Sequence, residues 1–433
     1  MTDSHAEIRN AAQEIKAQSL ELLSELIVAS TDARAIDRVT TRAMEQLGCA
    51  VESFDYAPKS VPLIDEFAAA DVTSGTNETC LVGHLLGSGD SRSLLLFAHP
   101  DTEEVPPAPS WRSDPSVPTE HDGRLYGWGV ADDLAGMAVL VQSVAVLRRA
   151  GMRPKGDVKL VSAPSKKHRR GISAALHRGL TADAAVYLHP AESGRGLDEI
   201  KAFAPGQLEF VITIEGKRPD TSEPAHTAFA HRAVNPLDKA MMVARALQDL
   251  DAERGDEVRH PRLQHAIGRS ANLMLTHCEV GAPQRLSRIA NACQLGGAMT
   301  LVPGESLDTV MAQVESAVSA VAAQDSWLAE HPPQVAWLAG VSAAETADEA
   351  PIYRTVANVL ADLGAKPQVN PLHTSSDIRN PIVQKAIPTV GFGPRCGGLA
   401  MSGLTDEWVD VADYHRAIAA TALIIASWCG VRA

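Results

Sequence analysis

The chain has 433 residues, of which 45% are hydrophobic and 21% are charged, a composition typical of a globular protein with room for two domains. The formal net charge of −14 argues against nucleic acid or an anionic membrane surface as the partner, because both attract basic proteins. The sequence has no apolar run of the ~20 residues that cross a bilayer and no signal-peptide pattern, so we expect a cytoplasmic protein that acts on a small molecule.

The first half of the chain predicts alternating helices and strands. Apolar residues at helical spacing predict a helix over residues 6–30, and short apolar runs predict strands over 93–98, 158–163 and 184–188, with a helix over 134–150. This alternation is typical of a sheet that helices cover on both faces. Ligand-binding groups on such sheets gather beyond the carboxyl ends of the strands.

The pattern changes from residue 208 onward. The order strand, helix, strand, strand, helix over residues 208–323 predicts a small α/β sandwich with one open sheet face, inserted into the larger domain. The first pattern then resumes with a helix over 353–363, a strand over 388–392 and a closing helix over 414–428. The sequence therefore predicts two domains, one formed by residues 1–207 and 339–433 and the other by residues 208–338.

Two segments carry side chains suited to metal chemistry. His99-Pro-Asp101 directly follows the strand over 93–98, and an aspartate two residues after a histidine can orient the imidazole for a metal. Alone, such a pair more often contains a histidine with a structural role in a turn than a metal ligand. Residues 122–136 form a glycine-punctuated loop that brings Asp132 and Asp133 to the start of a helix, where either could also be an N-cap.

A basic stretch, Lys166 to Arg170, follows the strand over 158–163. Taken alone it predicts a solvated turn, and we expect Arg169 and Arg170 to be surface charges. Its position at the carboxyl end of a buried strand also makes it a candidate for the site.

Together these segments resemble the M20 family of metal-dependent peptidases and amidohydrolases, and residues 375–379, 387–394 and 406–409 extend the resemblance over nearly the whole chain. The resemblance implies an α/β catalytic domain with a central mixed sheet, interrupted by an α+β, ferredoxin-like lid or dimerisation domain. It also implies a homo-oligomer that forms through the lid, and a site that usually holds two zinc ions.

The resemblance assigns the ligands of the first metal residue by residue. His99 and Asp132 match two ligands, Asp101 matches the orienting carboxylate, and His189 stands where the family has a carboxylate before a proline. Two histidines and an aspartate suit Mn, Fe, Co, Ni or Zn, so we expect one divalent transition metal per chain. Three protein ligands also predict that this metal is readily lost.

The second metal site does not match. Where the family has an adjacent glutamate pair, one a general base and the other a ligand, this chain has Ser165, Lys166 and Lys167, and no histidine occurs between His373 and His415. We therefore expect Lys166 or Lys167 to be a fixed positive charge in place of the missing ion.

In the lid, Asp220 stands where the family has a substrate-binding histidine. His226 and His231 lie nearby and are candidates to bind the substrate instead. They are equally compatible with exposed loop histidines.

Loss of the general base disfavours an unactivated amide as substrate, since such a base contributes roughly 10²–10⁴ in rate. The departures resemble a branch of the family that exchanges an aromatic amino group for hydroxyl, as in 5-nitroanthranilate, with metal-bound hydroxide as the nucleophile. On this hypothesis Arg379 binds the substrate carboxylate, His373 lines the pocket or has a structural role, and Glu192 is a proton shuttle or further ligand.

Two alternatives stay open at the level of sequence. The first is a conventional amidase or carboxypeptidase on N-acyl amino acids, with its base moved to Glu192, Asp133 or a lid histidine. The second is a non-catalytic relative that binds a small ligand.

Overall fold

The computed structural model describes residues 3–70, 72–102, 111–190, 193–223, 225–373, 376–398 and 405–433. It consists of two compact units. The first contains Met1–Ile64, Thr73–Ala204 and Glu345–Ala433, and the second contains Asp65–Val72 and Pro205–Ala344. The short segment Asp65–Val72, which the sequence analysis placed with the first domain, lies in the second unit because its strand joins that unit's sheet.

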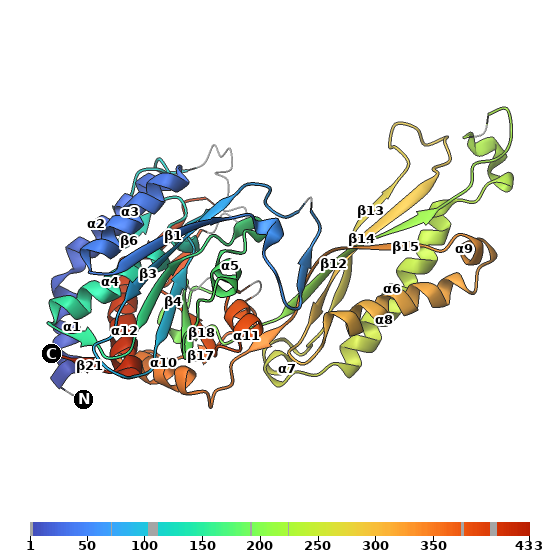
Figure 1. Cartoon of the computed structure of the whole chain (residues 1–433). Coiled ribbons are helices and arrows are strands. Elements are labelled where there is room, and N and C mark those ends of the chain that lie inside the picture. The colour runs from blue at the N-terminus through green and yellow to red at the C-terminus, as the bar shows by residue number, and fades with distance from the viewer. Residues whose placement is uncertain are drawn as a thin grey trace. The chain divides into compact units, whose positions relative to one another are not determined.

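The first unit is built on a mixed six-stranded sheet (Figure 1). In spatial order the strands are β1 (Ala50–Tyr56), β3 (Glu78–Leu85), β8 (Val158–Ser162), β4 (Leu94–Ala98), β9 (Ala184–Leu188) and β18 (Thr389–Phe392). Strands β8, β4, β9 and β18 are parallel to one another, whereas β1 and β3 extend one side in antiparallel pairing. Four carboxyl ends therefore meet along one edge of the sheet.

Helices cover both faces of this sheet, and consecutive strand residues serve opposite faces. Leu94 and Leu96 pack in the larger core, whereas Leu95 and Phe97 pack in the smaller core on the other face. The larger core contains residues of α1 (Asp3–Glu14), α2 (Lys16–Ala29), α3 (Ala33–Gln46), α4 (Ala135–Arg149), α10 (Pro351–Asp362) and α12 (Val411–Cys429). The helix α5 (Gly171–His177) packs in the smaller core, next to α11 (Arg379–Lys385) (Figure 1).

The helical segment Val130–Arg149, which contains α4, is the one segment in the described part of the chain that is long and apolar enough to cross a membrane. All of its most apolar window is buried inside the protein. Its hydropathy is therefore explained by its position in the core.

The second unit is an antiparallel sheet with helices on one face (Figure 1). Its strands in spatial order are β13 (Leu273–Val280), β14 (Ala292–Leu301), β12 (Gly206–Glu215), β15 (Gln334–Val341) and β2 (Glu66–Ala68). Alternate residues of β12 are buried, and they share a core with α6 (Pro236–Glu257) and α8 (Leu307–Ala322). The short helices α7 (Pro261–Ile267) and α9 (Ser326–Glu330) complete the unit.

The remaining strands are short. A four-stranded sheet consists of β19 (Cys396–Gly397), β20 (Trp408–Asp410), β6 (Arg124–Tyr126) and β5 (Thr119–His121). Two further pairs are β10 (Glu199–Ile200) with β17 (Gln368–Val369), and β21 (Val431–Arg432) with β7 (Arg153–Pro154). Strands β11 (Phe203–Ala204) and β16 (Ala344–Glu345) lie where the chain passes between the units.

The predicted fold class is confirmed: a mixed central sheet in an α/β unit, interrupted by an inserted α+β unit. One predicted element differs, because the helix over residues 6–30 is divided at Ile15 into α1 and α2.

Candidate metal centre

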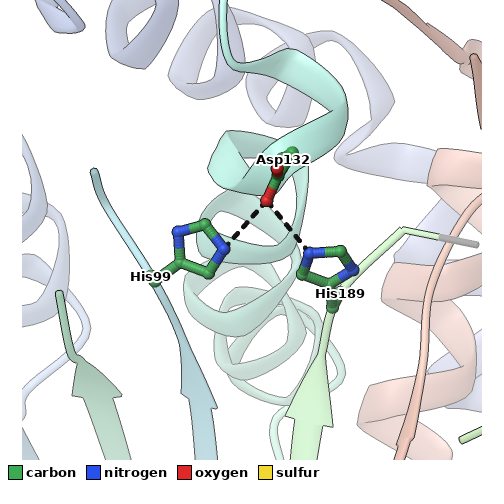
Figure 2. A group of neighbouring side chains, drawn as sticks. All are labelled: His99, Asp132 and His189. Atoms are coloured by element: carbon green, nitrogen blue, oxygen red, sulfur yellow. Dashed lines mark hydrogen bonds and ion pairs between the residues drawn. The ribbon is translucent and has the colours of Figure 1, made fainter. Parts of the chain in front are cut away.

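Three buried side chains from separate elements converge at the carboxyl edge of the first unit's sheet (Figure 2). His99 directly follows β4, His189 directly follows β9, and Asp132 comes from the loop before α4. Oδ1 of Asp132 lies 3.0 Å from Nε2 of His99 and 3.1 Å from Nε2 of His189. Their donor atoms all lie within 4.8 Å of one another, and this is the one group of three or more potential ligands among the described residues.

A glycine in the first turn of α4 lets Asp132 reach the ends of the strands. A Cβ on Gly136 would lie 1.9 Å from the carbonyl oxygen of Leu188 and 2.2 Å from Oδ1 of Asp133. Only glycine therefore fits where α4 meets the end of β9. This close approach brings the loop before α4 next to His189.

Nδ1 of each histidine faces a hydrogen-bond acceptor. A proton on Nδ1 leaves Nε2 as the nitrogen that can bind a metal. Nδ1 of His99 lies 3.0 Å from the carbonyl oxygen of Asp101 and 3.4 Å from its Oδ1. Nδ1 of His189 lies 3.0 Å from the carbonyl oxygen of Pro190. With Nδ1 as the donor in both rings, both Nε2 atoms, which lie beside Asp132, would be available to a metal.

The electrostatics of the cluster favour a charged carboxylate at its centre. Although burial alone would raise it, hydrogen bonds from His189 and His99 hold the pKa of Asp132 well below its usual range. Burial opposes the charged form of His99, but its hydrogen bonds to Asp101 and Asp132 raise its pKa well above the usual value. The cluster thus presents an ionised carboxylate oxygen between two imidazoles.

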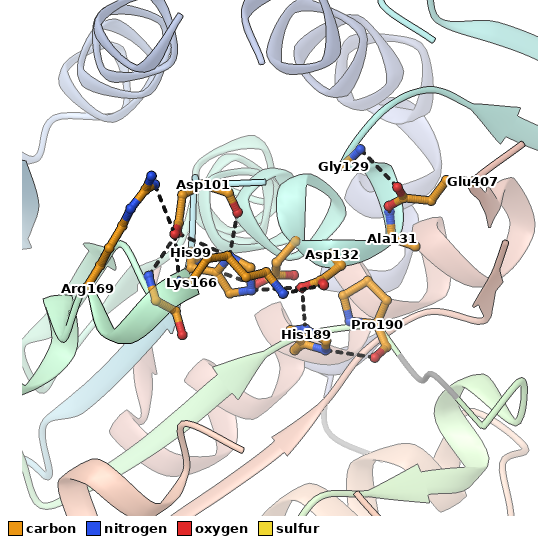
Figure 3. Close-up of polar contacts among 12 residues, drawn as sticks. His99, Asp101, Gly129, Ala131, Asp132, Lys166, Arg169, His189, Pro190 and Glu407 are labelled. Atoms are coloured by element: carbon orange, nitrogen blue, oxygen red, sulfur yellow. Dashed lines mark hydrogen bonds and ion pairs between the residues drawn. The ribbon is translucent and has the colours of Figure 1, made fainter. Parts of the chain in front are cut away.

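The basic stretch places Lys166 in this cluster (Figure 3). Nζ of Lys166 donates a hydrogen bond to Oδ2 of Asp132, the carboxylate oxygen that the histidines do not share. The carboxylate of Asp101 accepts from the backbone N–H groups of Ser165, at 2.8 Å, and Lys166, at 2.7 Å. Asp101 therefore anchors the turn that delivers Lys166. Lys167, with φ of 52°, is exposed.

The prediction that Arg169 and Arg170 are surface charges is wrong. The guanidinium of Arg169 lies 3.2 Å from Oδ2 of Asp101 and 3.2 Å from Oε1 of Glu78, so it ties the turn to β3. Arg170 donates to the carbonyl of Pro58 at 3.0 Å. The partners are far away in the sequence, which is why the local pattern did not reveal them.

Two further buried carboxyl groups also shape the centre: Glu407, to which the sequence analysis gave no role, and Asp133, which it gave as a possible N-cap or alternative base. Glu407 accepts hydrogen bonds from the backbone of Gly129, at 3.1 Å, and Ala131, at 2.7 Å, and so fixes the loop that carries Asp132 (Figure 3). Burial raises the pKa of Glu407 to about 8. Asp133 accepts from the backbone N–H of His99 at 3.1 Å, and burial raises its pKa well above the usual range.

The other predicted site residues are distributed as follows. His373 is buried beside the cluster, with its ring centroid 5.9 Å from that of His189. Arg379 is buried at the start of α11 in the same unit. His226 and His231 belong to the second unit, so their role in substrate binding stays a prediction. Glu192 lies outside the described residues.

The donor set fits a single divalent transition metal. Two imidazole nitrogens and one carboxylate oxygen suit Mn, Fe, Co, Ni or Zn, and three protein ligands leave coordination positions for water and substrate. The second oxygen of Asp132, which a second ion would need, instead faces the ammonium of Lys166. The described residues therefore offer ligands for one ion and a fixed cation beside it.

Known proteins that are similar to this chain include metal-binding peptidases. Residues 95–427 match the model of the Peptidase family M20/M25/M40. The chain is 24% identical, over 90% of its length and 87% of the relative, to the N-formyl-4-amino-5-aminomethyl-2-methylpyrimidine deformylase of Halalkalibacterium halodurans. Its fold is similar to that of an M20 family metallo-carboxypeptidase from Sulfolobus solfataricus, with 14% identity, a TM-score of 0.70, and coverage of 94% of this chain and 98% of that one. A dinuclear metal-binding M20 peptidase from Bacillus subtilis is also similar, with 13% identity, a TM-score of 0.58, and coverage of 95% of this chain and 99% of that one.

Proposed function

Because the chain belongs to the M20 peptidase family, whose members are metal-dependent hydrolases of amide and related C–N bonds, we propose that it hydrolyses an activated C–N bond with one metal ion. His99, Asp132 and His189 hold this ion. When bound, a divalent metal supplies Lewis acidity and lowers the pKa of water.

One observation carries the proposal: Nζ of Lys166 contacts the oxygen of Asp132 that a second metal would need. The ammonium supplies a single positive charge there and no coordination positions. It offers hydrogen-bond donors to negative charge that develops during the reaction, as an electrostatic stabiliser does. The segment from Ala163 to Gly171 contains no carboxylate to deprotonate water, which favours a substrate that is already activated.

The substrate that we propose is 5-nitroanthranilate. Water adds to the ring carbon that bears the amino group, a C–O bond forms, the C–N bond breaks and ammonia leaves, so the net change is amine plus water to hydroxyl plus ammonia. The ring nitro group accepts the negative charge of the addition step. Arg379, buried at the start of α11, binds the substrate carboxylate, and His373 lines the pocket next to His189.

The test is a direct assay. Chelator-treated protein is reloaded with Mn²⁺ and incubated with 5-nitroanthranilate, and ammonia release is measured together with loss of substrate. We expect ammonia and the hydroxylated product in equal amounts, only in the presence of metal. Turnover of N-acyl amino acids or N-formyl amines with no ammonia from nitroanthranilate would contradict the proposal.

A second candidate function is hydrolysis of an N-acyl or N-formyl amine. The similarity to a deformylase over 90% of the chain supports it. Formamides are less hindered than other amides, so this reaction is the first to examine if the aromatic amine is inert.

We also propose that two copies of the chain associate through the second unit. Strand β13 is at the edge of its sheet and most of its side chains are exposed. Met241 on α6 and Met274 on β13 are 64% and 68% exposed, so large apolar side chains of this unit are accessible to a partner. Light scattering should show a dimer or larger assembly, and Met241→Asp should weaken it. A monomeric wild-type chain would contradict this proposal.

A further inference from the structure

A fully buried lysine lies directly behind the metal ligand His189. Nζ of Lys201 donates to the carbonyl oxygen of Pro190 at 2.8 Å, and it lies 3.4 Å from Nδ1 of His189. Lysine side chains are rarely fully buried unless they are paired. The partner here is Glu199, itself buried, whose Oε1 lies 3.7 Å from Nζ.

The surrounding structure holds this ion pair in place. Glu199 accepts a hydrogen bond from Nδ2 of Asn370 at 3.0 Å and another from the hydroxyl of Ser193. The backbone of Lys201 exchanges two hydrogen bonds of 2.7 Å with Gly391 in β18. The pair is thus fixed by contacts from several segments of the first unit.

Gly391 allows this close packing. A Cβ at that position would lie 2.9 Å from the carbonyl oxygen of Tyr187 and 3.3 Å from Cβ of Lys201. Any larger residue would push Lys201 away from the end of β9, where His189 begins the loop.

We propose that Lys201 is a positioning residue for the metal ligand His189. The carbonyl oxygen of Pro190 accepts from both Nζ of Lys201 and Nδ1 of His189. Lys201 fixes the direction of this carbonyl, and the two groups together hold the Nδ1 side of the His189 ring so that its Nε2 points toward Asp132. The inference rests on the proposed single-metal site and adds a residue that orients one of its ligands.

The other histidine ligand, His99, is oriented by a different residue. Its Nδ1 faces the carbonyl and the carboxylate of the same residue, Asp101, which is held by the turn that carries Lys166. For His189 the group that Nδ1 faces is the carbonyl of Pro190, the residue that follows it. The direction of that carbonyl depends on what else it binds, and Lys201 is such a partner.

The test uses the full chain with Lys201→Met, which keeps a long apolar side chain but removes the donor. Calorimetric titration of chelator-treated protein with Mn²⁺ should give a dissociation constant about 10–100-fold higher than that of the wild type, as is typical for loss of a group that orients a ligand. Histidine ¹⁵N resonances of the metal-free protein, with His189 assigned through His189→Asn, should show a shift at Nε2 of His189, the ring nitrogen that faces Asp132.

A double variant separates positioning from folding. Lys201→Met leaves Glu199 buried without its cation, which can destabilise the chain, whereas Lys201→Met combined with Glu199→Gln removes both charges. The positioning role predicts weak Mn²⁺ binding and a shifted Nε2 resonance of His189 in the double variant as well. A matched control is Lys239→Met, which removes a lysine of the second unit that pairs with Asp325 at 2.6 Å and should leave Mn²⁺ binding unchanged.

The outcomes distinguish this inference from the proposed function. Wild-type affinity together with an unchanged Nε2 resonance of His189 in the double variant would overturn the positioning role. Wild-type protein that binds no Mn²⁺, or two ions per chain, would instead overturn the single-metal site on which the inference rests.

Discussion

Replacing Lys166 by Met should lower kcat/KM by about 10²–10³-fold, the usual effect of removing one electrostatic stabiliser of a transition state. The same change should not weaken Mn²⁺ binding, because it removes a positive charge next to the metal ligand Asp132. Steady-state rates and calorimetric titration of the same preparation measure the two effects. A variant that loses metal and activity together would show that Lys166 has a structural role only.

Lys167→Met is the matched control for this experiment. Lys167 is adjacent in sequence and exposed, and the structure directs Lys166 rather than Lys167 to Asp132. We expect the control to retain most of the activity. The opposite ranking of the two variants would mean that the turn after β8 is arranged differently when substrate binds.

Asp132→Asn should abolish activity and weaken Mn²⁺ binding by more than about 100-fold. Loss of a residue that only orients a metal ligand weakens binding by at most about that factor. The carboxylate contacts His99, His189 and Lys166 simultaneously, so the amide cannot replace it. Asn is nearly isosteric, and the variant should therefore remain folded. Thermal unfolding and calorimetry of the metal-free and Mn²⁺-treated variant measure these effects.

An exposed aspartate provides the control for this second experiment. Asp90→Asn removes the same charge from the exposed loop before the amino end of β4, whereas the metal ligands lie at the carboxyl ends of the strands, and it should leave metal binding intact. Mn²⁺ affinity of Asp132→Asn within tenfold of the wild type would exclude Asp132 as a ligand.

The elements that the sequence predicts well are those with clear apolar patterns. Residues 208–215 alternate cleanly and form most of β12, and the apolar run at 184–188 is the fully buried strand β9. The antiparallel strand β1 was not predicted. Most of its side chains are at least partly exposed, so they provide no apolar period to detect.

The metal ligands could be proposed from sequence because the segments that carry them resemble those of the M20 family, and each also directly follows a buried strand or precedes a buried helix. The sequence did not show whether Lys166 or Lys167 faces the site, because this depends on the turn that Asp101 anchors. Lys201 and Glu407 were missed for a different reason. Both contact backbone groups of distant segments. The residue types in a sequence do not reveal which side chains make such contacts.

The number of metal ions per chain tests the central claim most directly. Chelator-treated wild-type protein should be titrated with Mn²⁺ by calorimetry, with and without 5-nitroanthranilate. One ion per chain in both conditions is the result that His99, Asp132 and His189, with Lys166 beside them, predict. Two ions per chain would contradict the account, because a second metal would have to displace Lys166 from Asp132.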